Sequence, residues 1–287
     1  MSYRQIVALT FGGAGDDETL VFAARLAVEY HATIAVFPVY PDAALDLISF
    51  GMTLGAATSP ATLDAMDQAR KDMRHQLEAA CKRAASTVDL TCGASKRPPQ
   101  MIMAEALGQR VMALSRTLAL ADLVVISQVS LTTATLAKSA LAQALLQQRV
   151  PVLIGRGDAH GLSGTAAIAW DGSAQAGAAL RQALPLLLRS SAVVVIQCHE
   201  GLDPEAADPT FEPLMAYLRA HDIEPVTTRM ADGHPEDGAL IRAAESLGAR
   251  LVIAGAYGHS RLRETVFGGA TRAFLADVGG PSLLLAH

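Results

Sequence analysis

Cysteine, aromatic side chains and excess positive charge are all scarce in this sequence. Its three cysteines, Cys81, Cys92 and Cys198, form no Cys-x-x-Cys pair, and an odd number cannot all pair within one chain. Reduced thiols and a cytoplasmic location are therefore expected. Aromatic residues make up 5% of the chain, and the formal net charge is −5. Such a chain has no electrostatic footprint for nucleic acid or an anionic membrane surface, so neither is expected as a partner.

Long apolar runs and common catalytic motifs are also absent. The most apolar region, from Ala183 to Cys198, is interrupted by Arg189. A membrane span needs roughly 18 or more apolar residues, so none is expected. A strand-like run at residues 6–9 follows the N-terminus without the cationic and apolar segments of a secretory signal. No HExxH, GxSxG or GxxxxGK[ST] pattern occurs, so we expect no protein-held metal, serine-hydrolase elbow or phosphate loop of that type.

The sequence is instead rich in Ala, Leu and Val, and 51% of its residues are hydrophobic. Short runs of Val, Ile and Leu alternate with longer helix-like stretches. Strands buried on both faces lose the polar alternation of half-exposed strands, so these runs predict a buried parallel sheet with helical crossovers. A chain of 287 residues suits two such domains.

The chain repeats itself once. Residues 121–126 resemble 249–254, and the glycine-rich stretch 155–165 resembles a linker. We therefore predict two tandem doubly wound, Rossmann-like α/β domains, residues 1–157 and 164–287, each with a five-stranded parallel sheet flanked by helices. The predicted strands lie near 5–10, 33–37, 88–92, 122–126 and 151–154, and near 166–170, 192–198, 225–229, 250–254 and 282–286. Predicted helices of the second copy lie at 174–189, 211–221, 236–247 and 269–277.

The first copy is longer than the second. Thr10 to Ser127 spans 117 positions, whereas the matching stretch from Asp171 to Gly255 spans 84, so the first copy has about 33 extra residues. We place most of them in an insertion near 41–74. An extra helical hairpin covering apolar surface is the favoured interpretation, and a mobile lid is the alternative.

A glycine-rich loop follows the predicted strand 250–254. Its candidate ligand-binding residues are Gly255, Gly258, Gly268, Gly269 and Thr271. Glycines let backbone N–H groups approach phosphate oxygens, and the N-terminus of the following helix favours an anion. Ligands of open parallel sheets bind at the carboxyl ends of the strands where the strand order reverses, and there this loop should meet Asp171 and Cys198. The competing interpretations are a simple tight connection for the loop, and helix N-capping for Asp171.

The spacing Gly-x2-Gly-x9-Gly, the Trp-Asp-Gly-Ser start at 170–173 and the final Pro-Ser-Leu-Leu-Leu strand resemble the universal stress protein (UspA) family across the second copy. The first copy resembles it in its strands alone, so the chain looks like a tandem, two-domain member. The resemblance implies an adenine nucleotide, ATP with or without Mg²⁺, in the second domain. Asp171 would lie at the adenosine end, Cys198 near the base, Gly255 near the ribose and Gly268 at the phosphates. The family has Ser or Thr where Gly269 stands.

The first copy departs further from that pattern. Thr10 replaces the aspartate, Ser127 and Ser130 replace the first two glycines, and Lys138 with Ser139 falls where the last glycines lie. We predict no nucleotide there. The resemblance also implies that the final strands pair, so residues 151–154 would meet 281–286 in an internal pseudo-dimer. Further association into a homodimer is left open.

Three functions fit the sequence. The first is a stress-response regulatory protein whose nucleotide binding alters a surface read by an unknown protein partner. The second is a scaffold that binds no nucleotide and acts through protein contacts. The third, least favoured, is an enzyme that hydrolyses ATP or transfers an adenylyl group. Only Glu264 and Asp277 near the loop offer a general base, so no catalytic residue is predicted and at most weak hydrolysis is expected.

Overall fold

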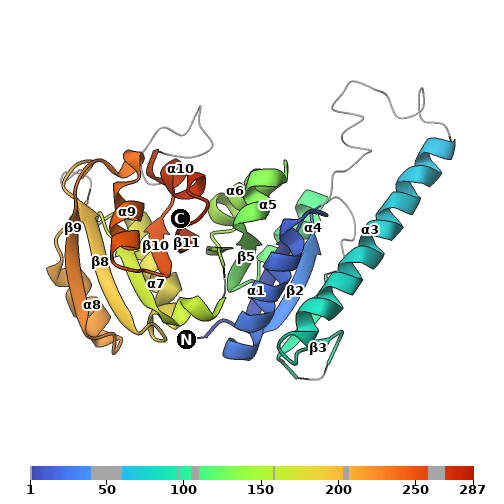
Figure 1. The fold of residues 1–287 in the computed structure, drawn as a ribbon, viewed down its shortest axis with the longest axis horizontal. Coiled ribbons are helices and arrows are strands. Elements are labelled where there is room, and N and C mark those ends of the chain that lie inside the picture. Colours follow the sequence, from blue (N-terminus) through green and yellow to red (C-terminus); the bar gives the residue numbers. More distant parts are fainter. Residues whose placement is uncertain are drawn as a thin grey trace.

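The computed structural model describes residues 2–39, 60–95, 97–104, 110–157, 159–202, 207–257 and 269–287. Within these ranges, eleven strands form one sheet in the order β3-β4-β2-β1-β5-β6-β11-β10-β7-β8-β9 (Figure 1). Neighbouring strands are parallel, except β6 and β11, which are antiparallel. The strands are β1 (Gln5–Thr10), β2 (Thr33–Pro38), β3 (Thr91–Cys92), β4 (Gln100–Met103), β5 (Leu123–Ser127), β6 (Val152–Gly155), β7 (Thr165–Ala169), β8 (Ala192–Cys198), β9 (Val226–Ala231), β10 (Leu251–Gly255) and β11 (Ser282–Ala286).

The central strands are apolar along their whole length because helices cover both faces of the sheet. All five residues of β5 and all five of β11 are buried. One apolar core lies under α1 (Gly15–Tyr30), α3 (Pro60–Ser86), α7 (Ala174–Leu187) and α8 (Glu212–Ala220). The other lies under α4 (Arg110–Leu118), α6 (Ala137–Ala142), α9 (Ala239–Ser246) and α10 (Gly269–Ala276). The predicted doubly wound α/β architecture is confirmed.

The predicted five-stranded sheet of the N-terminal half is wrong. Six strands of that half enter the sheet, and β4, which pairs with β2, was not expected. The predicted strand at 88–92 is reduced to the two exposed residues of β3. The two halves also share one continuous sheet, because β6 and β11 pair across the junction. The expected meeting of these two strands is therefore present, in antiparallel register with Leu153 opposite Leu284.

The extra length of the N-terminal half lies in part in α3. Helices α3 and α8 hold matching positions, because each precedes the outermost strand of its half. Helix α3 has 27 residues, three times the 9 residues of α8. Its C-terminal part packs beside α1, while its other end extends beyond the rest of the described chain (Figure 1). The insertion predicted near 41–74 thus contains the start of a single long helix. Residues 40–59 lie outside the described part, so the hairpin and lid interpretations stay untested there.

Side chains of the N-terminal half also reach α7 in the C-terminal half. The hydroxyl of Tyr3 donates to the carbonyl of Gln182 at 2.6 Å, and that of Tyr30 donates to the carbonyl of Pro185 at 3.1 Å. The two tyrosine rings pack edge to face, with centroids 5.3 Å apart. These contacts, together with the β6–β11 pair, fix one half against the other.

Candidate functional site

The strand order of the C-terminal half reverses between β10 and β7. The connection after β7 runs through α7 on one face, while that after β10 runs through α10 on the other. In an open α/β sheet with divergent connections, the usual ligand position is a crevice at the carboxyl ends of the strands beside the reversal. Of the predicted site residues, Asp171, Cys198, Gly255, Gly269 and Thr271 all belong to the segments around this end. Gly258 and Gly268 lie outside the described residues.

Asp171 organises the turn that leads into α7. Its Oδ1 accepts a hydrogen bond from the amide of Ser173 at 2.9 Å. Ser173 in turn caps the helix, because its Oγ accepts from the amide of Ala176 at 3.1 Å. The N-capping function expected of this region is therefore present and belongs to Ser173. Asp171 itself is half-buried and directly follows β7 and Trp170 at the carboxyl end of the sheet.

Cys198 is the last residue of β8 and is 3% exposed. Burial is the main cause that raises the pKa of its thiol, and Glu200 adds to the effect while Arg242 opposes it. A buried thiol with a raised pKa is a packing group rather than a nucleophile. The part of Cys198 that a ligand could use is therefore its main chain.

The segment 207–210 lies across the ends of β7 and β8. Its carbonyls accept hydrogen bonds from the indole of Trp170, through Thr210 at 3.3 Å, and from the side chain of Gln197, through Pro209 at 2.9 Å. Gly172 has a φ of +78° and lies under the carbonyl of Asp208, so a side chain there would meet main chain. Residues 207–210 therefore border the part of the sheet end where the adenosine was expected. Their sequence has no regular pattern from which this location could have been predicted.

Gly255 ends β10 directly beneath the start of α7. A Cβ at this position would lie 2.7 Å from the amide nitrogen of Ala176 and 2.7 Å from the carbonyl carbon of Gln175. A real side chain cannot approach main chain so closely, so glycine is required here by helix packing whether or not a ligand binds.

Gly269 begins α10 and faces an acidic side chain. A Cβ placed on it would collide with Cγ, Cδ and Oε1 of Glu236. Glu236 belongs to the short 3-10 helix η3 (Pro235–Asp237), which packs against α10. Two residues further on, Thr271 is 4% exposed, and its Oγ1 accepts a hydrogen bond from the amide of Tyr257 at 3.5 Å. Thr271 thus ties α10 to the end of β10.

The corresponding place in the N-terminal half is filled by the protein's own polar groups. Ser127 Oγ donates to the carbonyl of Gly15 at 2.9 Å and also contacts Ser130 Oγ at 3.0 Å. The buried carboxylate of Asp16 accepts hydrogen bonds from the amides of Phe11 and Gly12, both at 2.8 Å. Main-chain donors that could have met an external anion are therefore already paired within the chain.

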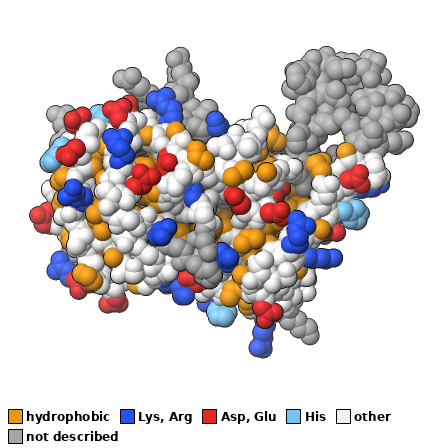
Figure 2. Space-filling model, viewed as in Figure 1, with side chains coloured by type: hydrophobic (Ala, Val, Ile, Leu, Met, Phe, Trp, Pro, Cys, Tyr) orange, Lys and Arg blue, Asp and Glu red, His pale blue; other side chains and the backbone are white. Residues whose placement is uncertain are grey.

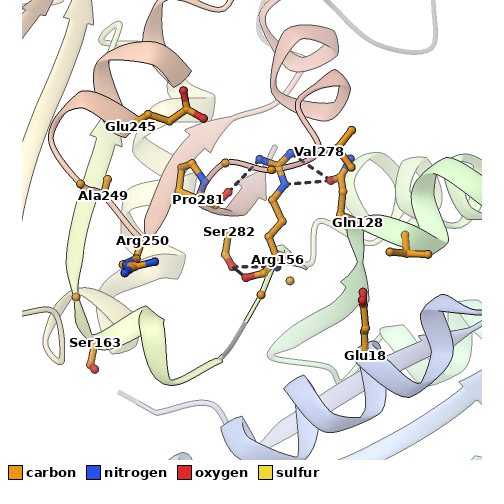
Figure 3. A pocket seen from close by; sticks show the side chains of 17 residues that line it. Glu18, Gln128, Arg156, Ser163, Glu245, Ala249, Arg250, Val278, Pro281 and Ser282 are labelled. Carbon is orange, nitrogen blue, oxygen red and sulfur yellow. Dashed lines mark hydrogen bonds between the residues drawn. The ribbon is translucent and has the colours of Figure 1, made fainter.

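A separate cavity lies at the junction of the halves (Figure 3). It measures about 990 Å³, and its walls include Glu18, Glu245 and Arg250. Arg156 crosses it and donates to Gln128 Oε1 at 3.2 Å and to the carbonyl of Phe274 at 2.7 Å. Because the walls carry both signs of charge and the guanidinium is paired within the protein, this cavity is a weaker candidate than the crevice.

Other kinds of site find little support in the described residues. Within them, no group of three His, Cys, Asp or Glu side chains is arranged to hold a metal ion. None of the described helices is both long enough and apolar enough to span a bilayer. On the face shown in Figure 2, acidic and basic side chains are interspersed rather than gathered into one basic area.

The fold and the crevice together define a doubly wound α/β protein whose C-terminal half has the geometry of a ligand-binding sheet end. Residues 165–284 match the model of the Universal stress protein family. The family recognised in the sequence is thereby confirmed for the C-terminal half. A search among curated proteins found no match.

Three solved structures share the fold over nearly the whole chain. A universal stress protein from Archaeoglobus fulgidus is 14% identical, with a TM-score of 0.67, and the match covers 99% of this chain and 96% of that one. A putative universal stress protein from Pseudomonas aeruginosa is 13% identical, with a TM-score of 0.53 and coverage of 99% and 93%. A functionally unknown protein from Pseudomonas aeruginosa is 12% identical, with a TM-score of 0.54 and coverage of 99% and 92%.

Proposed function

We propose that the C-terminal half binds an adenine nucleotide in the crevice between β7 and β10, and that the protein acts as a nucleotide-responsive regulator in a stress response. The observation that carries the proposal is the convergence of Asp171, the end of β8 and the start of α10 at the strand-order reversal of a half that matches the universal stress protein family. The expected ligand is ATP or another adenine nucleotide, with or without Mg²⁺.

The residues fit the nucleoside end of such a ligand better than the phosphate end. Asp171 presents a half-buried carboxylate, and Gly172 leaves only main chain beside it. At the start of α10, by contrast, Glu236 already lies against Gly269. The proposal places nucleotide binding in the domain 164–287 alone. The domain 1–157 is left without a nucleotide because Ser127 and Asp16 already form hydrogen bonds with other groups of that domain.

Helix α10 offers a physical link between the crevice and the junction of the halves. Its first residue, Gly269, borders the crevice, while its C-terminal carbonyls at Phe274 and Leu275 accept hydrogen bonds from Arg156 and Gln128. A ligand that shifts the start of this helix would therefore strain contacts at the junction. A protein partner that reads the junction surface, or a second copy of the chain, would sense the bound state.

A scaffold that binds no nucleotide is the second candidate. Gly255 and Gly269 both have packing reasons to be glycine, and the hydroxyl of Thr271 serves the fold. In this case the chain shares the fold of the family but not its ligand, and it functions through contacts of its surface with other proteins. The free thiols of Cys81, Cys92 and Cys198 support a reducing, cytoplasmic location under either candidate.

Isothermal calorimetry with AMP and with ATP separates the two candidates. The regulator is expected to bind about one ligand per chain. Gly258→Val should abolish this binding by placing a branched side chain in the glycine loop. The matched control is Gly13→Val in the N-terminal half, where a Cβ would meet no atom within 4 Å. Absence of heat with both nucleotides at millimolar concentration would leave only the scaffold.

A further inference from the structure

Two of the three cysteines lie on facing elements at the outer edge of the N-terminal half. Cys81 is in the C-terminal part of α3, and Cys92 is the last residue of β3, the outermost strand. Helix α3 packs against both β3 and β4, and β3 lies beside its C-terminal part (Figure 1). The fold therefore brings the segments that carry these two thiols together.

The register of β3 with β4 sets the direction of the Cys92 side chain. Cys92 pairs with Met101, and residues in register on neighbouring strands project from the same face of a sheet. Met101 is 1% exposed and belongs to the apolar core under α1 and α3. Met103, two residues further along β4, is on that same face and accepts a weak hydrogen bond from Cys81 Sγ at 3.8 Å. Cys92 therefore projects toward α3, on the side where Cys81 lies.

The packing around Cys81 lets α3 come close to the sheet. The buried residues of α3 next to it are small, namely Ala80, Ala84 and Ala85. The connection from α3 into β3 is short and fixed, because the amide of Leu90 donates to the carbonyl of Ala85 at 3.0 Å. On the other side of Cys92, the amide of Gly93 donates to β4 at 2.8 Å. Cys92 is therefore held between two anchored neighbours.

The two thiols differ in their access to solvent. Cys92 is exposed, whereas Cys81 is buried. Burial is the largest cause that raises the pKa of each thiol, and the charge of Cys92 is the next cause at Cys81. Because such a charge effect decays with distance, it agrees with the facing positions of the two residues. An oxidant in solution therefore reaches Cys92 first, with Cys81 beside it.

We propose that Cys81 and Cys92 form a reversible disulfide when the protein meets a peroxide. The thiolate of Cys92 attacks one oxygen of hydrogen peroxide, an S–O bond forms as the O–O bond breaks, and the hydroxide that leaves is protonated to water. The sulfur of Cys81 then attacks the sulfur of Cys92, and the S–S bond forms as the S–O bond breaks. The hydroxyl group leaves with the proton of Cys81 as a second water. The two sulfurs together lose two electrons, and the peroxide gains them.

The disulfide joins an edge strand to the helix that covers it. β3 has only two residues, and the outermost strand of a sheet pairs on one side alone. Such an edge opens locally at little cost in the reduced protein, and the covalent bond removes that freedom. A dithiol reverses the bond by thiol–disulfide exchange. This modification site is separate from the crevice and holds whether or not a nucleotide binds.

The test oxidises the full-length protein with hydrogen peroxide, labels the remaining thiols with N-ethylmaleimide in guanidinium chloride, and maps the peptides by mass spectrometry. The original protein should carry three labels before oxidation and one, at Cys198, after it. The peptides that contain Cys81 and Cys92 should appear joined, with the loss of two hydrogen atoms. Treatment with dithiothreitol before labelling should restore all three labels.

Two variants identify the partners. Cys92→Ser changes an exposed residue and should give no joined peptide, with labels kept at Cys81 and Cys198. Cys198→Ala is the matched control, because it removes a buried thiol of the other half and should form the joined peptide as the original protein does.

Four outcomes would overturn the proposal. They are a joined peptide that contains Cys198, a dimer of two chains linked through Cys92, oxidation of Cys92 while Cys81 keeps its label, and retention of all three labels under excess peroxide.

Discussion

Gly255 of β10 lies against Ala176 of α7, so that a Cβ built on Gly255 would be 2.7 Å from the amide nitrogen of Ala176. At the matching contact in the N-terminal half, the glycine is on the helix instead of the strand. In the repeat, Ser127 stands where Gly255 does, and Gly15 stands where Ala176 does. A Cβ on Gly15 would lie 2.5 Å from Oγ of Ser127 and 2.6 Å from the amide of Ser130. Each half therefore keeps one small residue at this helix–strand contact, so packing alone accounts for Gly255.

The first prediction concerns the two glycines that border the crevice. Gly255→Ala should lower the free energy of unfolding by about 1–3 kcal/mol, because its Cβ would meet the main chain of α7. Gly269→Ala should change it by less than about 1 kcal/mol, because only the flexible side chain of Glu236 has to move. Urea unfolding of both variants measures the difference. Equal costs would contradict the packing argument.

The second prediction concerns Arg156, which binds residues of both halves. Its side chain is 3% exposed and pairs with Asp277 at 3.1 Å, with Gln128, and with the carbonyls of Phe274 and Pro281. Arg156→Ala should cost about 2–4 kcal/mol of stability, because buried acceptors lose their donor.

The matched control for this prediction is Arg189→Ala. Arg189 also joins the two halves, through Glu29, but its side chain is 50% exposed. Its loss should cost less than about 1 kcal/mol, because solvent screens an exposed pair. Denaturant unfolding of the two variants gives the comparison, and similar costs would show that burial of Arg156 contributes nothing to the junction.

The third prediction is a pH dependence that originates at Asp16. Burial is the main cause that raises the pKa of this carboxyl, and hydrogen bonds from the amides of Phe11, Gly12 and Gly13 oppose it. A raised pKa means that the folded protein binds the proton more tightly than the unfolded chain does. The contribution of Asp16 to stability is therefore greatest below the ordinary aspartate pKa of about 4, and it is lost as pH rises through the raised value.

Urea unfolding of the original protein and Asp16→Asn across this range checks the sign. The variant cannot titrate at this position, so the stability of the original protein relative to it should fall as the pH rises above the ordinary aspartate pKa of about 4. A relative stability that rises with pH would mean that the amide hydrogen bonds outweigh burial.

The fourth prediction concerns the reactivity of the three thiols. Cys92 is exposed, whereas Cys81 and Cys198 are buried. Burial, the largest cause, raises the pKa of Cys81 to about 12, with Cys92 and two acidic groups adding to it. A thiol reagent such as 5,5′-dithiobis(2-nitrobenzoic acid) should therefore modify one cysteine rapidly in the folded protein. Cys92→Ser should remove that rapid phase, and its persistence would show that a buried thiol is accessible.

Much of the fold was predictable because buried parallel strands leave continuous apolar runs. The runs at β1, β5, β8 and β11 lie within one or two residues of their expected positions. β4 was missed because it is short and mostly half-buried, and because it follows Pro98 and Pro99, which indicate a loop. The helix expected at 236–247 begins at Ala239, since Gly238 adopts a left-handed conformation that ends η3.

The crevice could be predicted in position but not in detail. A glycine after a strand indicates that another group approaches its main chain closely, but the sequence does not identify that group. Gly255 contacts α7, which is separated from it in the sequence by β8 and β9. Gly269 contacts Glu236, a polar residue of the short helix η3. Such contacts depend on the tertiary arrangement, and no local pattern encodes them.

The location of the adenine ligand is tested most directly by photolabelling with 8-azido-AMP, followed by mapping of the labelled peptides. The account predicts label in the peptides that contain Asp171–Ser173, the end of β8 or Gly255–Tyr257, with protection by excess AMP. Label in peptides containing Gly12–Asp16 or Ser127–Ser130, or labelling that AMP does not prevent, would contradict it.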